Sequence, residues 1–136
     1  MAKSISSFFA RLGAPLVNHR WSWGALRSSD GAVFLRVWQD HKFIEDGRMH
    51  FQVDRYTPDE LGSLGLHEGL RHIDRILAGG PCYLVMCRAV DIHVVPRAIQ
   101  DSDDINLFVG GKIVERGGAT WVQVTGRRTV GEMTPK

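Results

Sequence analysis

The residues best suited to binding a ligand lie in two neighbouring stretches of the sequence, NHRWSWGALR and AVFLRVWQD. Alternate side chains of a strand share one face, so we expect Trp21 and Trp23 on the same face of the first stretch. Pairing the two stretches as a hairpin would bring Trp38 within reach of those rings. A nucleobase suits such a wall, because it has a π-face for stacking and an edge that needs hydrogen bonds. The alternative is that these rings are core residues, and only their exposure separates the two interpretations. The arginines interleaved with the rings are Arg20, Arg27 and Arg36.

The same region offers a second chemistry. Asp30 lies in the turn SSDG, and Asp40 and Lys42 follow the second stretch as Asp-x-Lys. Metal-dependent nucleases of the PD-(D/E)xK type place two carboxylates on Mg²⁺ and a lysine beside the attacking water. The alternative catalytic set is therefore Asp30, Asp40 and Lys42, although turn chemistry alone also explains Asp30.

Other catalytic and cofactor motifs do not occur in the sequence. The six histidines form no HExxH pair and no familiar zinc spacing, and GGKI lacks the frame of a phosphate-binding loop. We therefore expect no metal and no cofactor. Cys82 and Cys87 lie in one expected strand and point to opposite faces, which predicts buried, reduced thiols.

Size and composition are those of one ordinary globular domain. The chain has 136 residues, with 43% hydrophobic and 24% charged residues and a net charge of +2. We expect a single domain over residues 1–126 and a disordered tail over 127–136. No apolar run is long enough to span a bilayer, and Arg11 interrupts the N-terminal stretch too early for a signal peptide, so we expect a cytoplasmic protein without membrane contact.

Hydrophobic periodicity places these candidates on secondary structure. SISSFFARLG predicts a short amphipathic helix, and strands at about 20–27, 32–40 and 48–53 predict a three-stranded antiparallel meander. A second helix is expected over about 66–78, with Leu70, Ile73 and Leu77 inward. CYLVMCRAVD predicts a central strand, and the rest up to Gly126 predicts short strands joined by Gly-Gly turns. The fold class is therefore α+β, with a curved, mainly antiparallel sheet or a small open β-barrel and two or three helices.

A family resemblance rests on the stretches FFARLGAPLVNHRWSWGA, VFLRVWQD, RHIDRILAGGPCYLVMCRAVD and LFVGGKIVE. They resemble a bacterial domain family found alone or ahead of an HNH nuclease domain in proteins of restriction or defence systems. The resemblance covers about residues 8–124. In outline this family is similar to PUA-like and EVE-type domains, β-barrels that hold a flipped, modified base in an aromatic pocket.

This resemblance implies a DNA-binding module that reads a modified base and has no catalytic site of its own. Tryptophan rings would stack on the base, Asn18 or Asp40 would read its edge, and arginines would hold phosphates. No HNH domain follows in this sequence, so we expect a reader that works with a separate nuclease chain. The implied ligand-binding set, with the neighbouring Arg36, is Asn18, Arg20, Trp21, Trp23, Arg36, Trp38 and Asp40.

Three hypotheses follow from the sequence. The leading one is a nucleic-acid-binding module, with DNA favoured as the ligand. The alternatives are a PD-(D/E)xK-type nuclease and a non-enzymatic protein-interaction domain, for which a homodimer is one form.

Overall fold

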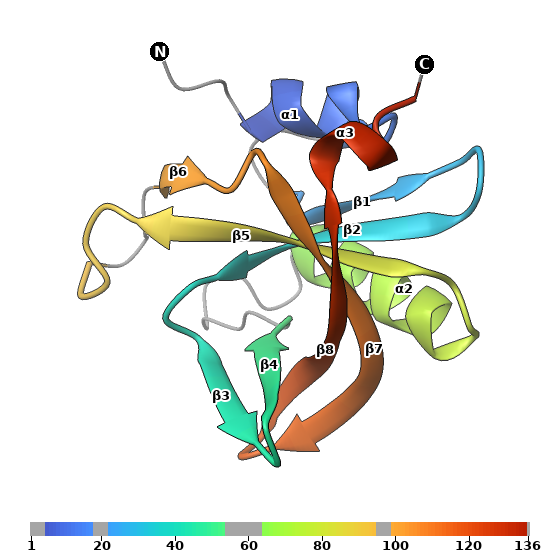
Figure 1. Cartoon of the computed structure of the whole chain (residues 1–136). Coiled ribbons are helices and arrows are strands. Elements are labelled where there is room, and N and C mark those ends of the chain that lie inside the picture. Colours follow the sequence, from blue (N-terminus) through green and yellow to red (C-terminus); the bar gives the residue numbers. More distant parts are fainter. Residues whose placement is uncertain (1–4, 18–21, 54–63, 95–98, 136) are drawn as a thin grey trace.

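The computed structural model describes residues 5–17, 22–53, 64–94 and 99–135. Within these ranges the chain forms one sheet of eight strands and three helices (Figure 1). The elements are α1 (Ile5–Arg11), β1 (Gly24–Arg27), β2 (Ala32–Trp38), β3 (Lys42–Glu45), β4 (Arg48–Gln52), α2 (Leu64–Leu77), β5 (Cys82–Ala89), β6 (Ile99–Ser102), β7 (Asn106–Arg116), β8 (Ala119–Thr129) and α3 (Val130–Met133). None of the described helices is long and apolar enough to cross a membrane.

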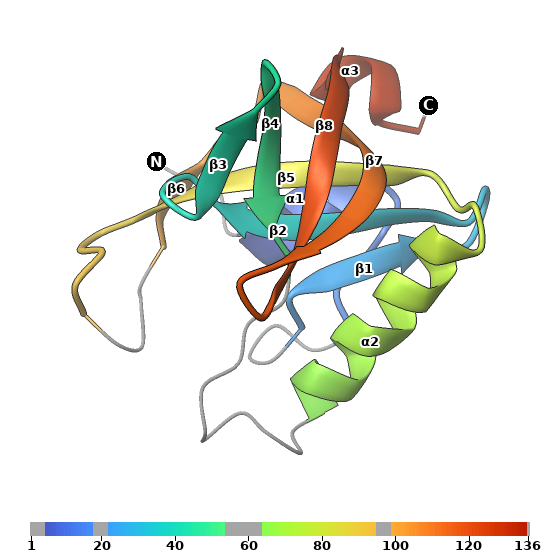
Figure 2. The same ribbon diagram turned by 90° about the horizontal axis from the view of Figure 1, so that it is seen from below.

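The sheet is open and strongly curved, with the strand order β1-β2-β5-β7-β8-β4-β3 and with β6 pairing to β5 (Figure 2). The pair β2–β5 is parallel, and the other pairs among the described strands are antiparallel. The predicted fold class, α+β with a curved and mainly antiparallel sheet, is confirmed. β5 is a central strand between β2 and β7, as its apolar character on both faces predicts.

The predicted meander is wrong beyond its first hairpin. β1 and β2 pair as expected, with Ala25 opposite Phe34. β4, however, pairs with β3 and β8, while β5 takes the second edge of β2. Every residue of β2 is buried, which requires a partner strand on both edges and cover on both faces. Alternation along a strand predicts which side chains share a face, but it does not identify the neighbouring strand.

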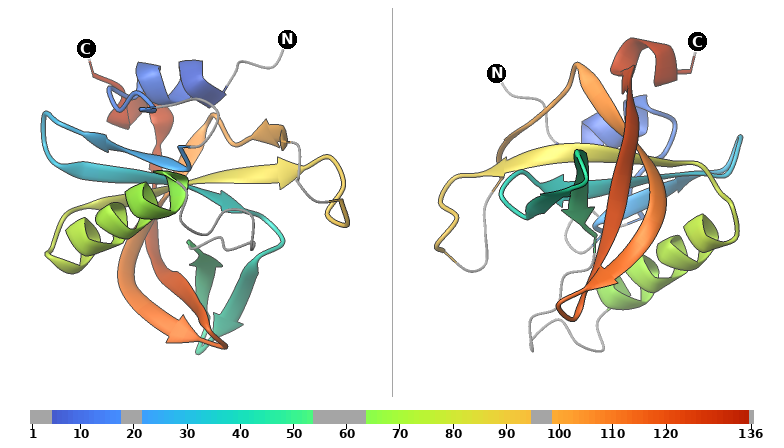
Figure 3. Two further views of the ribbon diagram at one scale, coloured as in Figure 1. Left: turned by 180° about the vertical axis from the view of Figure 1, so that it is seen from behind. Right: turned by 60° about the horizontal axis from the view of Figure 1, so that its bottom comes forward.

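Two hydrophobic cores lie on opposite faces of the sheet. Phe34 and Trp38 of β2 belong to the first core, with Phe8 and Phe9 of α1 and Val130 of α3. Val33, Leu35 and Val37 belong to the second core, with Phe51 of β4 and Ile76 of α2. α1 and α3 therefore cover one face and α2 the other (Figure 3). Cys87 lies in the first core and Cys82 in the second, and both thiols are free, as predicted.

Gly110 and Gly111 lie inside β7, where the sequence predicts a turn. The register between β7 and β8 shifts around Gly110, so the pair of glycines forms a β-bulge. A Cβ added at Gly110 would stand 2.8 Å from the Cys82 Sγ and 2.9 Å from a methyl carbon of Val122. The actual turn uses Gly117 and Gly118, which have φ angles of +61° and +79°. β7 and β8 consequently form one long ribbon of 11 residues a strand.

The predicted disordered tail is also wrong for most of its length. β8 continues to Thr129, and α3 follows directly. A capping box closes the start of α3, because the Thr129 side chain accepts a hydrogen bond from the Glu132 amide and the Glu132 side chain accepts one from the Thr129 amide. Val130 is buried in the first core. A four-residue helix with one buried residue is too short to show a helical repeat of hydrophobic residues, so the sequence pattern does not predict α3.

Candidate functional site

Trp23 and Trp38 are neighbours, as the hairpin predicts, but they do not form an open pocket. Their ring centroids are 5.5 Å apart at an interplanar angle of 40°. Trp38 is only 2% exposed and belongs to the first core, and Trp23 is partly buried against the same core. A base cannot stack on Trp38 without opening the core. The predicted base-binding role of Trp38 is therefore corrected to a packing role.

Arg36 does not reach solvent either. It is 5% exposed, its guanidinium carbon lies 4.0 Å from the centre of the Trp23 ring, and it donates a hydrogen bond to the backbone oxygen of Ser22. These contacts occupy the guanidinium, which is therefore not available to a phosphate or base. Asp40 is exposed in the turn after β2, with its carboxylate 3.7 Å from the His41 Nε2. Three other residues of the predicted set, Asn18, Arg20 and Trp21, lie outside the described residues.

The nuclease arrangement is not formed. Asp30 precedes β2 and Asp40 follows it, and the seven-residue strand between them spans about 20 Å at about 3.3 Å per residue. Two carboxylates at that separation cannot share one Mg²⁺. Asp30 instead binds Arg27, whose hydrogen bonds are the largest cause of a lowered pKa for the Asp30 carboxyl group. Among the described residues, no cluster of three His, Cys, Asp or Glu side chains could hold a metal.

The inward face of α2 carries two polar residues, Glu68 and His72, that the hydrophobic pattern of the sequence does not predict. Leu70 and Leu77, which were expected inward, are 45% and 66% exposed, whereas Glu68 and His72 are 3% and 8% exposed. The buried face of the helix is therefore Glu68, His72 and Ile76, spaced by four residues. The Ser22 hydroxyl donates a hydrogen bond of 3.0 Å to the Glu68 Oε2. Ile73, the third residue expected inward, is partly buried against the second core, so the prediction is wrong for the two leucines only.

Burial favours the neutral forms of Glu68 and His72, and it shifts their pKa values in opposite directions. Desolvation raises the pKa of Glu68, and the hydrogen bond from Ser22 partly opposes that shift. Desolvation, aided by the nearby charge of Arg71, lowers the pKa of His72 to about 4. At neutral pH His72 is therefore uncharged inside the protein. This cluster joins α2 to the start of β1.

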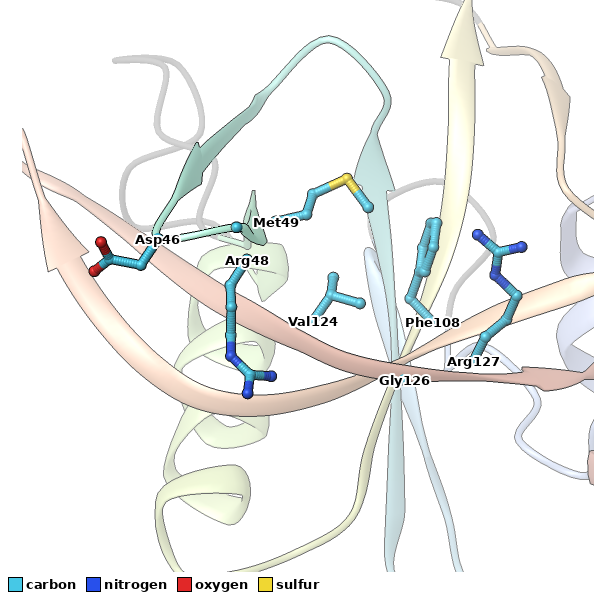
Figure 4. A pocket seen from close by; sticks show the side chains of 8 residues that line it. Asp46, Arg48, Met49, Phe108, Val124, Gly126 and Arg127 are labelled. Atoms are coloured by element: carbon cyan, nitrogen blue, oxygen red, sulfur yellow. The ribbon is translucent and has the colours of Figure 1, made fainter.

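A cleft lies elsewhere, between the β3–β4 turn and the β7–β8 ribbon (Figure 4). Its volume is about 550 Å³, within the usual range of ligand-binding pockets, and it is open to solvent. Met49, Phe108 and Val124 supply its apolar surface, and Arg48 and Arg127 stand on either side of them (Figure 4). The complete lining is Asp46, Gly47, Arg48, Met49, Phe108, Val124, Gly126 and Arg127.

Strand register brings Phe108 and Arg127 together. They are paired across the β7–β8 ribbon, so their side chains share one face. The Arg127 guanidinium carbon lies 5.3 Å from the centre of the Phe108 ring. Phe51 supports that ring from the second core, with the two centroids 5.5 Å apart. The next residue, Arg128, is paired with Leu107, a buried residue of the first core, and does not line the cleft.

The two cleft arginines differ from the other arginines in their ion pairing within the described residues. Arg27, Arg88 and Arg116 each form an ion pair, with Asp30, Asp101 and Glu45 respectively. Arg48 and Arg127 form no ion pair within the described part of the chain, and both side chains are exposed. The cleft therefore presents an aromatic ring between two exposed arginines, with the carboxylate of Asp46 also in its lining.

Comparisons of the chain with family models, with curated proteins and with solved structures find no match. The resemblance to restriction-associated and EVE-type domains therefore stays a prediction.

Proposed function

We propose that this chain is a nucleic-acid-binding module and that the ligand occupies the cleft between the β3–β4 turn and the β7–β8 ribbon. The observation that carries this proposal is the placement of Phe108 between Arg48 and Arg127, two exposed arginines that form no ion pair with any described residue. Arginine is the side chain best matched to phosphate, because its planar guanidinium donates two parallel hydrogen bonds. An aromatic ring beside such arginines provides contact for the less polar part of a nucleotide.

The form of the cleft favours a polymer over a small enclosed ligand. Specific small-molecule pockets bury most of the ligand surface, whereas this cleft is widely open to solvent. An open groove with cations at its rim is suited to a phosphate backbone that enters on one side and leaves on the other. DNA is the polymer that the sequence resemblance favours.

Cellular context belongs to the same proposal. The proposal includes a cytoplasmic location, since two free, buried cysteines suit a reducing compartment. If the resemblance to restriction and defence proteins holds, a separate nuclease chain is the proposed partner.

Fluorescence anisotropy with labelled 15-nucleotide DNA and RNA, in single-stranded and duplex form, tests the binding directly. We expect binding at 50 mM salt that weakens about tenfold at 200 mM salt, because two phosphate contacts release about two counterions. Arg127→Gln should weaken binding about tenfold, while Arg128→Gln removes the same charge from the neighbouring position on the other face and should change it little. Failure of every polymer to bind at 50 mM salt would overturn the proposal.

A further inference from the structure

We propose that the cleft accepts an unpaired base, stacked on Phe108, so that the ligand is single-stranded rather than duplex nucleic acid. This inference rests on the proposed function and specifies which part of a nucleic acid enters the cleft. It is carried by the surroundings of the Phe108 ring.

Phe108 lines the cleft and packs against the second core. The ring is half-buried, and Phe51, which is fully buried, packs against it at an interplanar angle of 33°. Val124 and Met49 extend the apolar surface beside it. A ring held in this way can present one face to a ligand without losing conformational entropy on binding.

The planar guanidinium of Arg127 already lies over the Phe108 ring. The Arg127 guanidinium lies 5.3 Å from the ring centre and has no ion pair among the described residues to hold it there. A base has the same flat shape and a larger π-surface. Rotation of the exposed Arg127 side chain would let a base take the place of the guanidinium, which could then bind the flanking phosphate or stack on the outer side of the base.

Other aromatic rings of the described structure lack this combination. Phe43 has His50 stacked on it at 4.4 Å, and the Arg116 guanidinium carbon lies 4.2 Å from its centre. Phe34 is stacked on Tyr83 and fully buried. Of the rings in the described ranges, Phe108 is the one that lines the cleft.

Duplex nucleic acid cannot use this ring. In a duplex the faces of each base are covered by the bases above and below, so a base reaches an aromatic side chain only after it leaves the stack. A single strand offers its base faces without that step. We therefore expect a single strand to bind more tightly than a duplex. An abasic single strand, which keeps the phosphates and lacks the bases, measures the contribution of the phosphates alone.

The experiment measures anisotropy at 50 mM salt for three 15-mers of equal charge per strand: oligothymidylate, the same backbone with abasic sites throughout, and a mixed-sequence duplex. We expect the abasic strand to bind at least tenfold more weakly than oligothymidylate, and the duplex to bind more weakly than the single strand. Phe108→Leu should remove most of the difference between the first two ligands, and Phe108→Tyr should retain it. Phe43→Leu removes a ring that also carries an arginine but lies outside the cleft, and should leave the difference unchanged.

The outcomes separate the two proposals. Equal binding of the thymidylate and abasic strands, with both weakened by Arg127→Gln, would overturn base stacking and leave nucleic-acid binding in place. Preference for the duplex would overturn the single-strand inference in the same way. No binding of any ligand would overturn both. Circular dichroism melts of the Phe108 variants identify a loss of folding, and Phe108→Tyr keeps the ring if Phe108→Leu unfolds.

Discussion

Ser22 and Glu68 are joined by a buried hydrogen bond of 3.0 Å across 46 residues of sequence. Ser22 is fully buried just before β1, and Glu68 lies on the inward face of α2. The bond therefore fixes the helix to the hairpin at a point where both partners have left water. Loss of one partner leaves the other desolvated without its hydrogen bond.

Ser22→Ala should lower the free energy of unfolding by about 1–3 kcal/mol, because it removes a donor from a buried carboxyl group. Urea denaturation monitored by tryptophan fluorescence measures this change. Ser28→Ala, an exposed position in the β1–β2 turn, is the matched control and should shift the midpoint very little. Equal effects of the two substitutions would show that the buried bond contributes nothing.

His72 should make stability depend on pH in the acidic range. Its pKa is lowered from 6.5 to about 4 by burial, so the unfolded chain binds a proton at a higher pH than the folded chain does. The contribution of neutral His72 is fully present above pH 6.5 and is lost as the pH falls from 6.5 toward 4, by up to about 3 kcal/mol in total. Glu68, with a raised pKa, acts in the opposite sense, since its contribution is lost as the pH rises above 4.5. His72→Leu should flatten the curve between pH 6.5 and 4, and an unchanged slope in that variant would contradict the assignment.

Arg27 should be far more important for stability than an arginine in an exposed ion pair. It is 7% exposed, and its guanidinium donates hydrogen bonds to the backbone oxygens of Leu12 and Met133 as well as to Asp30. These bonds tie the segment after α1 to the last residue of α3 (Figure 1). Arg27→Met should lower the free energy of unfolding by about 2–4 kcal/mol, since the buried Leu12 carbonyl and the part-buried Met133 carbonyl and Asp30 carboxylate lose their donor. Arg88→Met breaks the exposed pair with Asp101 and should cost less than about 1 kcal/mol. Thermal melts of both variants provide the comparison.

Gly110→Ala should destabilise the β7–β8 ribbon. The new methyl group would stand less than 3.0 Å from the Cys82 Sγ and a Val122 methyl, inside the second core. Overpacking of this kind costs about 1–3 kcal/mol. Gly117 offers no such contact, but its positive φ makes it an unsuitable control. Gly131, which has neither a positive φ nor a close neighbour, serves instead, and Gly131→Ala should leave the melting temperature nearly unchanged.

The sequence predicts those features that depend on neighbouring residues. The β1–β2 hairpin follows from alternation and the SSDG turn, and the two faces of β2 follow from its period of two. Long-range pairings are not predicted in this way, because β4 selects β8 through contacts formed about 70 positions later in the chain. The bulge at Gly110 requires knowledge of Cys82 on the adjacent strand, which the sequence alone does not supply.

The candidate site shows the same limit. Trp23, Arg36 and Trp38 do come together as predicted, yet they are held by core contacts that composition cannot distinguish from a ligand pocket. The cleft residues gave no local signal. Phe108 and Arg127 are joined only by strand register, and Arg127 falls in the segment that the sequence predicted as a disordered tail.

Binding of a labelled single-stranded 15-mer by the wild-type chain, Arg127→Gln and Arg128→Gln, across 50–200 mM salt, tests the central claim most directly. We predict measurable binding by the wild-type chain, about tenfold weaker binding by Arg127→Gln with a salt slope reduced by about one, and near wild-type binding by Arg128→Gln. Absence of binding at 50 mM salt, or equal losses in the two variants, would contradict the assignment of the cleft as a nucleic-acid site.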